Sequence, residues 1–254
     1  MSTRREFLQK ATLAGLGMGT IPDIANAAVS EQHVVNKQKI ALKKDAVILF
    51  QGDSITDSGR RREATSSNNI EMLGTGYALF TATAILAKHA ALQPKMFNRG
   101  ISGHKVFQLR ERWENDTLAF KPDVLSILIG VNDYWHTLNG NYKGTVQIYE
   151  TDLRNLLTYT KEKLPNVQLV LCEPFALSGG SAIKDAEWFP MFNDYRASLK
   201  KIAGEFGTIF VPFQAAFNEA IKKAPATYWS GDGVHPDLPG RQLMAEVWLK
   251  ATGL

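Results

Sequence analysis

Short apolar runs alternate with longer amphipathic segments along most of this chain. The short runs are apolar on both faces, which is typical of strands buried in a parallel sheet. The predicted strands are residues 46–50, 95–98, 123–129, 167–172 and 208–211. Apolar residues recur at helical spacing over residues 77–92, 106–118, 145–164, 190–206, 213–223 and 238–249. This alternation predicts an α/β protein, a three-layer α/β/α sandwich around a mostly parallel five-stranded sheet.

Two long loops are expected, over residues 57–74 and 133–145. Loops of this length in a compact domain are usually functional or mobile. In open α/β sheets, ligands bind beyond the carboxyl ends of the strands. The polar motifs of this sequence follow predicted strands, so we expect them to meet at one edge of the sheet.

The N-terminus has the features of an export signal. Arg4 and Arg5 are followed by a modestly apolar segment over residues 11–21 and by the small-x-small pattern Ala25-Asn26-Ala27. Together they resemble a twin-arginine signal, which predicts a periplasmic or secreted protein. An amphipathic arm on a cytoplasmic protein is the alternative. The predicted division is a signal over residues 1–27, a linker or arm over 28–44 and one domain over 45–254.

Composition excludes several classes of protein. The net charge is +4, and the basic residues are spread along the chain without a basic block, so nucleic acid is not an expected partner. The mature part contains no run of about 18 apolar residues, so no membrane span is expected. Cys172 is the single cysteine, which leaves no intrachain disulfide and no cysteine zinc site.

Each of the first two predicted strands ends in a motif that allows a catalytic and a purely structural interpretation. Gly52-Asp53-Ser54 places a serine just beyond a strand, where it could act as a nucleophile if a base lies nearby, although such a tripeptide is often an ordinary turn or helix cap. Gly100 follows the second strand. Its N–H could approach an anion closely, or the glycine could serve only the turn.

The remaining two motifs supply an amide and a possible base. Asn132 follows an apolar strand and could donate to a developing oxyanion or satisfy loop backbone groups. Asp232 and His235 are three residues apart, so the carboxylate can hold Nδ1–H of the imidazole and leave Nε2 free. One histidine and one aspartate make an incomplete zinc set, and we expect no metal site.

The four motifs, in this order over residues 45–250, resemble those of the SGNH (GDSL-like) hydrolase superfamily, which has a flavodoxin-like fold. The resemblance implies that Ser54 is the nucleophile, that His235 is the general base and then acid, and that Asp232 orients it. It also implies an oxyanion hole made by the N–H groups of Ser54 and Gly100 and the side chain of Asn132. No metal or organic cofactor is needed for this chemistry.

Longer matches resemble one branch of that superfamily, the acetylxylan and acetyl-xylooligosaccharide esterases. They lie at residues 52–60, 73–77, 98–103 and 112–116. The chain departs from the branch at Gly231, where a tryptophan is usual, and in its export signal. The branch contains oligomers, so a homo-oligomer is possible, but no interface can be read from this sequence.

The resemblance and the absence of a long apolar flap favour a short acyl group. We therefore expect a serine esterase that removes O-acetyl groups from carbohydrate such as xylan-derived oligosaccharides. The alternatives are a related esterase acting on a lysophospholipid, thioester or aryl ester, and a non-catalytic exported glycan-binding module. Aromatic residues at the rim could stack on sugar or anchor loops. Candidate substrate-binding residues are Asp53, Arg60, Asp133, Tyr134, Trp135, Tyr228 and Trp229.

Overall fold

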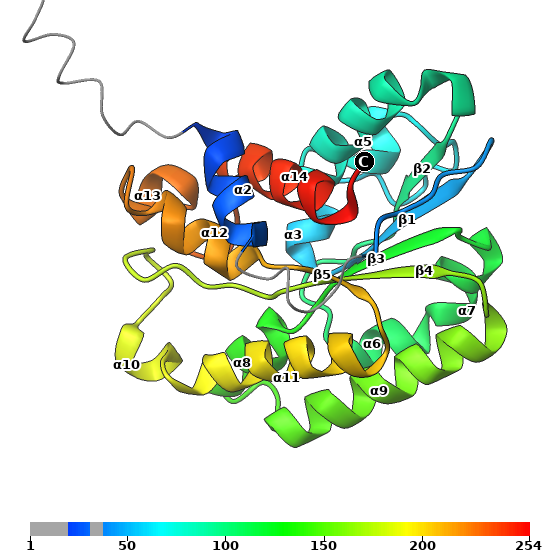
Figure 1. Ribbon diagram of the computed structural model, residues 1–254. Coiled ribbons are helices and arrows are strands. Elements are labelled where there is room, and N and C mark those ends of the chain that lie inside the picture. Colours follow the sequence, from blue (N-terminus) through cyan, green and yellow to red (C-terminus); the bar gives the residue numbers. More distant parts are fainter. Residues whose placement is uncertain (1–19, 31–37) are drawn as a thin grey trace, which may run out of the picture.

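A single parallel sheet forms the centre of the protein. The computed structural model describes residues 20–30 and 38–254 (Figure 1). The strands run in the order β2-β1-β3-β4-β5, and every neighbouring pair is parallel. This confirms the predicted five-stranded α/β fold. The strands are β1 (Val47–Gly52), β2 (Lys95–Asn98), β3 (Val124–Leu128), β4 (Gln168–Cys172) and β5 (Ile209–Val211).

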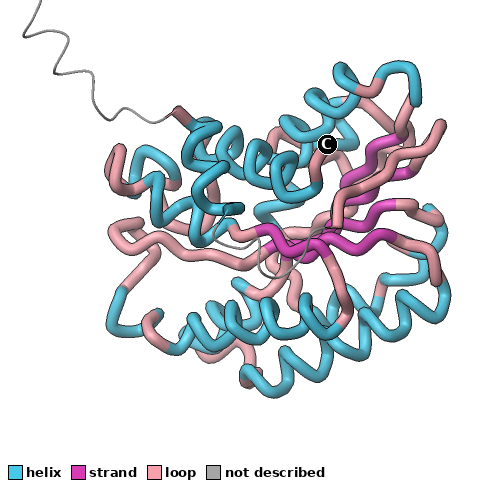
Figure 2. The backbone as a smooth tube through the Cα atoms, in the orientation of Figure 1, coloured by secondary structure: helices cyan, strands magenta, loops and turns pink. Residues whose placement is uncertain are grey.

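Helices cover both faces of the sheet (Figures 1 and 2). One layer contains α2 (Ile21–Ser30), α5 (Tyr77–Lys88), α12 (Phe213–Ala220) and α14 (Leu238–Thr252), and the other contains α6 (Val106–Glu111), α9 (Val146–Lys163) and α11 (Met191–Glu205). Short helices occupy the connections. They are α3 (Ser54–Asp57), α4 (Ile70–Leu73), α7 (Trp113–Asp116), α8 (Val131–Leu138), α10 (Asp185–Trp188), α13 (Ala226–Trp229), η1 (Ala90–Leu92) and η2 (Leu118–Phe120).

Aromatic side chains fill the core on the α5 and α14 side of β1. The Phe50 ring lies 5.8 Å from the Tyr77 ring and 5.6 Å from the Trp248 ring, measured between centroids. Nε1–H of Trp248 donates to Oγ of Ser126 on β3, so its polar edge is satisfied inside the core. Burying each such side chain contributes roughly 1.5–3 kcal/mol of stability. This packing fixes the end of β1, from which the chain leaves toward the polar motifs.

The strand order reverses direction between β1 and β3, which is where open α/β sheets bind ligands. Gly52 ends β1 and is paired with Leu128 at the end of β3. A Cβ at position 52 would lie only 2.2 Å from the Leu128 carbonyl oxygen, so only glycine allows this approach. The segments that carry Ser54 and Asn132 therefore leave the sheet side by side.

Two predicted boundaries are wrong. The expected loop over residues 133–145 begins as helix α8, because Asn132 and Asp133 are buried polar residues that mask its amphipathic pattern. The expected helix over residues 106–118 breaks at Arg112, whose backbone leaves helical geometry. Its guanidinium donates instead to the carbonyls of Arg99 and Gly52.

The N-terminal helix α2 crosses the predicted boundary between signal and linker. Ile24, Ala25, Ala28 and Val29 are buried where α2 packs on α12 and α14, so residues 28–30, part of the predicted linker or arm, are helical. Residues 1–19, which carry the paired arginines, lie outside the described residues. Within the described ranges, no helix is long and apolar enough to cross a membrane.

Candidate active site

Ser54 opens helix α3 directly beyond the sheet. The Asp53 carboxylate caps this helix, with Oδ1 accepting from the Ile55 N–H at 3.0 Å. The cap leaves the Ser54 N–H without an acceptor among the described residues, at the first position of the helix. The strand-to-helix turn thus presents the hydroxyl and the N–H of Ser54 together.

The Ser54, His235 and Asp232 side chains form one hydrogen-bonded series. Oγ of Ser54 lies 2.8 Å from Nε2 of His235, and Nδ1 of His235 lies 2.6 Å from Oδ2 of Asp232. The other carboxylate oxygen of Asp232 accepts from the N–H groups of Val234 and His235 at 2.8 and 2.7 Å. The carboxylate therefore fixes both the orientation of the imidazole and the turn that carries it.

The electrostatics of this pair favour an ionised carboxylate next to the ring. Burial alone would raise the pKa of Asp232, but hydrogen bonds from the His235 ring and from the two backbone N–H groups outweigh it and lower that pKa below its usual value. The hydrogen bond to Asp232 raises the pKa of His235, against the opposing effect of burial. The imidazole is thus a stronger base than a free histidine.

The buried hydroxyl of Ser230 forms hydrogen bonds with the Asp232–His235 turn. It is fully buried and lies 2.9 Å from the His235 carbonyl oxygen and 3.2 Å from Oδ1 of Asp232. It also accepts from the Gly233 N–H at 3.0 Å. One side chain thus contacts three residues of the turn, which positions the acid and the base together.

The loop after β4 supports the same turn from outside. N–H groups of Leu177, Ser181 and Ala182 donate to the carbonyls of residues 233, 231 and 232 at 2.9, 3.1 and 3.0 Å. These bonds run between two irregular segments, not within a sheet. The Asp232–His235 turn is therefore held as a rigid unit although it belongs to no helix or strand.

Gly100 does not lie where the sequence predicted. Its N–H donates to Oδ1 of Asn98 at 2.9 Å, so it is not directed at Ser54. A Cβ at position 100 would lie 2.4 Å from the Asp57 nitrogen, which shows that this glycine allows close packing against α3. The prediction that Gly100 supplies an oxyanion donor is therefore wrong on this geometry.

Gly103, in the same turn, has a free N–H instead. It adopts φ +81°, a conformation that suits glycine, and its N–H has no acceptor among the described residues. Its turn joins the two other groups, because the Ile101 N–H donates to the Gly52 carbonyl and Nδ2 of Asn132 donates to the His104 carbonyl at 3.2 Å. The Asn132 amide keeps a second N–H for another acceptor.

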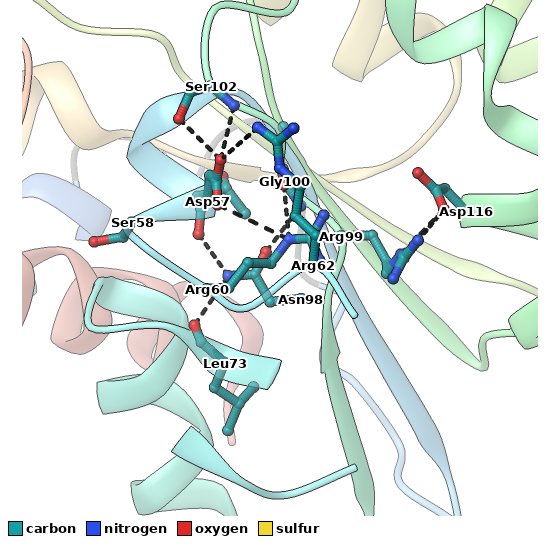
Figure 3. A network of polar contacts seen from close by, with 12 residues as sticks. Asp57, Ser58, Arg60, Arg62, Leu73, Asn98, Arg99, Gly100, Ser102 and Asp116 are labelled. Atoms are coloured by element: carbon teal, nitrogen blue, oxygen red, sulfur yellow. Dashed lines mark hydrogen bonds and ion pairs between the residues drawn. The ribbon is translucent and has the colours of Figure 1, made fainter. Parts of the chain in front are cut away.

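A buried polar network braces this turn (Figure 3). Oδ2 of Asp57 accepts from both the N–H and the hydroxyl of Ser102 at 2.9 and 2.8 Å. Nε of Arg60 donates to the Gly100 carbonyl at 2.8 Å, and Arg99 pairs with Asp116. The Ser58 hydroxyl points away from the network in this view. The network connects α3 to the turn after β2 and so fixes the distance between Ser54 and Gly103.

A cavity of about 400 Å³ opens beside Ser54 and His235. Its walls combine glycines, hydroxyl groups and one guanidinium with the side chains of Ile55, Tyr77, Pro236 and Met244. The lining residues other than Ser54 and His235 include Ser58, Gly59, Thr75, Gly76, Ser102 and Arg241.

Most of the predicted substrate-binding residues do not reach this cavity. Asp53, Arg60, Asp133, Tyr134 and Trp229 are at most 5% exposed. Each has a structural partner, as Tyr134 has in the Glu187 carbonyl and Trp229 in the Ala224 carbonyl. These assignments are wrong for this structure.

The two remaining candidates lie nearer the surface. The Trp135 ring is partly exposed and lies 6.2 Å from the His235 ring between centroids. Tyr228 is 56% exposed but packs edge-on against Trp229, and it does not line the cavity. Trp135 is thus the predicted aromatic residue that the structure places beside the acid–base pair.

Two buried carboxyl groups near the site, Asp53 and Asp133, have raised pKa values. Burial raises the pKa of Asp53 and of Asp133 to about 7. In each, one carboxyl oxygen accepts from a backbone N–H and the other has no partner among the described residues. Across the described part of the chain, no three His, Cys, Asp or Glu side chains come together as a metal site requires.

A Ser–His–Asp series with free N–H donors, here at the strand ends of a parallel α/β sheet, is the arrangement found in serine hydrolases. The chain belongs to the GDSL-like Lipase/Acylhydrolase family, whose family model matches residues 50–243. It is a carboxylic ester hydrolase.

Relatives of known name support this assignment. An acetylxylan esterase from Geobacillus stearothermophilus is 36% identical over 213 residues, which cover 81% of this chain and 93% of that protein. Its crystal structure superposes with a TM-score of 0.75 over 85% of this chain and 97% of that one, at 34% identity. A chain from Parabacteroides merdae, provisionally named a GDSL-like lipase, superposes with a TM-score of 0.84 at 69% identity, covering 85% and 99% of the two chains.

Sequence reasoning missed several residues of the site. Gly103 lies within the family-like segment 98–103 but carried no predicted role, and neither did Ser230 or Arg241. Gly103 could have been weighed equally with Gly100, because both are glycines of the same turn. No sequence pattern marks Ser230 or Arg241, since their contacts arise only when the loops meet.

Proposed function

We propose that this esterase removes short acyl groups, acetyl above all, from hydroxyl groups of carbohydrate. The observation that carries the proposal is the 2.8 Å contact between Oγ of Ser54 and Nε2 of His235 in the wall of the cavity. Ser54 is the nucleophile, His235 the base and then the acid, and Asp232 the orienting carboxylate. The Ser54 and Gly103 N–H groups and the Asn132 amide form the oxyanion hole.

The reaction proceeds through an acyl-serine. His235 takes the Ser54 proton as Oγ attacks the ester carbonyl, and the three donors stabilise the oxyanion. The C–O bond to the alcohol then breaks, and His235 returns the proton to the departing alkoxide. Water repeats the sequence, which releases the carboxylic acid and regenerates Ser54.

The cavity supports a small acyl group and a hydroxylated alcohol. Ser58, Thr75 and Ser102 offer hydroxyl partners to the alcohol, and Ile55 and Met244 offer apolar contacts to a short acyl group. Sugars are recognised through such hydrogen bonds. The relatives named acetylxylan esterase and acetyl-xylooligosaccharide esterase point to the same class of substrate.

Acetate release from acetylated xylo-oligosaccharides tests the proposal. The purified protein should release acetate, and its kcat/KM on 4-nitrophenyl esters should fall sharply beyond the acetyl ester. Ser54→Ala should fold normally and lose both activities. Equal rates on acetyl and octanoyl esters, with no acetate from any acetylated glycan, would favour the lysophospholipid or aryl-ester alternative.

We also propose that the protein is exported through its paired arginines, Arg4 and Arg5. Expression of the full chain in a bacterium with a twin-arginine system should place the esterase in the periplasm or the medium. The double variant R4K/R5K should keep it in the cytoplasm. Export that is unaffected by the substitution would contradict this assignment.

A further inference from the structure

Arg241 brings a guanidinium into the wall of the catalytic cavity. It lies six residues after His235, in the first turn of α14. Nε donates to the Pro236 carbonyl at 2.8 Å, and Nη1 donates to the carbonyl and the hydroxyl of Thr75 at 3.0 and 3.2 Å. These contacts fix the plane of the guanidinium between α14 and the loop before α5.

The charge of Arg241 has no counter-ion among the described residues. All its partners are neutral oxygens, and no carboxylate oxygen lies within ion-pair distance. Asp237, one turn earlier on α14, instead uses Oδ2 to accept from the Gly231 N–H at 2.8 Å. Within the described part of the chain, Nη2 donates to no group, so a fixed cation with one free nitrogen lines the cavity.

A second cation, Arg62, contacts Asp57, the carboxylate that also binds Ser102. The Arg62 side chain is 57% exposed, and its Nη2 lies 3.7 Å from Oδ2 of Asp57. That oxygen already accepts two hydrogen bonds from Ser102, so Arg62 is only weakly compensated. The half-buried His104 is also sensitive to positive charge, because burial and then Arg112, Lys105 and Arg62 lower its pKa to about 4.

We propose that the natural substrate is an acylated sugar that carries a carboxylate, and that Arg241 binds this carboxylate from the cavity wall. The inference rests on the proposed function, since it specifies the alcohol side of the same ester. The free Nη2 of Arg241 can donate a charge-assisted hydrogen bond to a carboxylate oxygen. Uronic acids supply such a carboxylate next to hydroxyl groups that can be acetylated.

Paired substrates test this proposal. An O-acetylated methyl glucuronoside can be offered as the free carboxylate and as its methyl ester, which differ only in the charge. The wild-type protein should prefer the carboxylate by about tenfold in kcat/KM, the size of one hydrogen bond between charged groups. The preference should shrink at high ionic strength, because salt screens the interaction at this open rim.

Variants separate charge recognition from bracing of the loop. Arg241→Gln should abolish the preference, and Arg241→Lys should retain part of it, whatever either does to the rate on the methyl ester. Lys88→Gln is the matched control, since Lys88 is exposed at the far end of α5, about 16 Å along the helix from Tyr77. It removes one positive charge and should leave the preference unchanged. A preference that survives in Arg241→Gln would overturn the proposal.

Inhibition of 4-nitrophenyl acetate hydrolysis separates this proposal from the proposed function. Glucuronate should inhibit competitively and its methyl ester much more weakly, with the difference lost in Arg241→Gln. Equal cleavage of the charged and neutral acetylated sugars, with equal inhibition, overturns the carboxylate assignment and leaves the carbohydrate esterase standing. Selective inhibition without cleavage of any acetylated sugar supports the carboxylate site and contradicts the carbohydrate function. No cleavage and no inhibition overturns both.

Discussion

Gly180 lies against Gly233 so closely that a Cβ on Gly180 would be 2.3 Å from the Gly233 Cα. The two glycines belong to the loop after β4 and to the turn that carries Asp232 and His235. Contact of backbone on backbone leaves no flexible side chain to move aside. The two loops can therefore lie this close only because Gly180 has no Cβ.

Gly180→Ala should push the Asp232–His235 turn away from Ser54. A displacement of about 1 Å at a catalytic group can cost about 100-fold in rate, and we expect kcat on 4-nitrophenyl acetate to fall by about that factor. Gly204→Ala is the control, since a Cβ there meets nothing within 4 Å. Comparable kcat values for the two variants would show that the loop after β4 does not set the position of the base.

Ser230→Ala removes a hydroxyl that bonds three residues of the same turn. The Gly233 N–H would lose a buried acceptor, which costs about 1–3 kcal/mol of stability. We expect a lower Tm together with a lower kcat. Ser181→Ala is the matched control, because Ser181 is exposed and contributes only its backbone N–H to this contact. A Tm unchanged in Ser230→Ala would contradict the assignment of a positioning role.

Asn132→Ala removes one oxyanion donor. We expect kcat to fall by about 100- to 1,000-fold with little change in KM, because the lost interaction forms mainly in the transition state. Asn139→Ala, at the exposed end of the same helix, should behave as wild type. A raised KM at unchanged kcat would indicate that Asn132 serves only to anchor the His104 carbonyl.

The free energy of unfolding should decrease as the pH rises, because the buried Asp133 must then lose its proton. Burial, and to a smaller extent the charge of Asp53, raises the pKa of Asp133 from its ordinary 3.8 to about 7. The hydrogen bond from the Val106 N–H and the charge of Lys105 lower this pKa but do not outweigh burial. The folded protein thus keeps a proton that the unfolded chain releases, so its contribution is complete below about pH 4 and is lost as the pH rises through 7. Asp53 acts in the same direction.

Asp133→Asn keeps an acceptor for the Val106 N–H but cannot ionise. The free energy of unfolding, measured with urea between pH 5 and 7, should then fall less steeply, by up to about 1.4 kcal/mol per pH unit. Asp194→Asn, at an exposed position of α11, should not change the slope. An identical slope in Asp133→Asn would mean that Asp133 is ionised in the folded protein.

The sheet was predictable because its strands are apolar on both faces. β2 lies at the predicted residues, and the other strands differ by one or two residues at one or both ends. The polar residues after those strands had to converge, since parallel strands end at one edge. That reasoning correctly brought Ser54, Asn132, Asp232 and His235 together.

The failures share a physical cause. The sequence cannot show which of two glycines in one turn has a free N–H, because the Asn98 side chain that occupies the Gly100 N–H is placed only by the fold. Buried polar residues such as Asp133 and Tyr134 looked like exposed rim residues for the same reason. The distant partner of a buried polar group is set by the fold, and the sequence reveals it only where a motif already links the two residues, as for Ser54 and His235.

The 181 positions that separate Ser54 from His235 make esterase activity a late event in the life of the chain. The nucleophile is synthesised early, but its base arrives only with the turn before α14, the C-terminal helix. Recovery of hydrolysis after dilution from denaturant should therefore coincide with the last step of refolding and not with the first collapse. A newly made molecule is harmless to cellular esters until its final helix has docked.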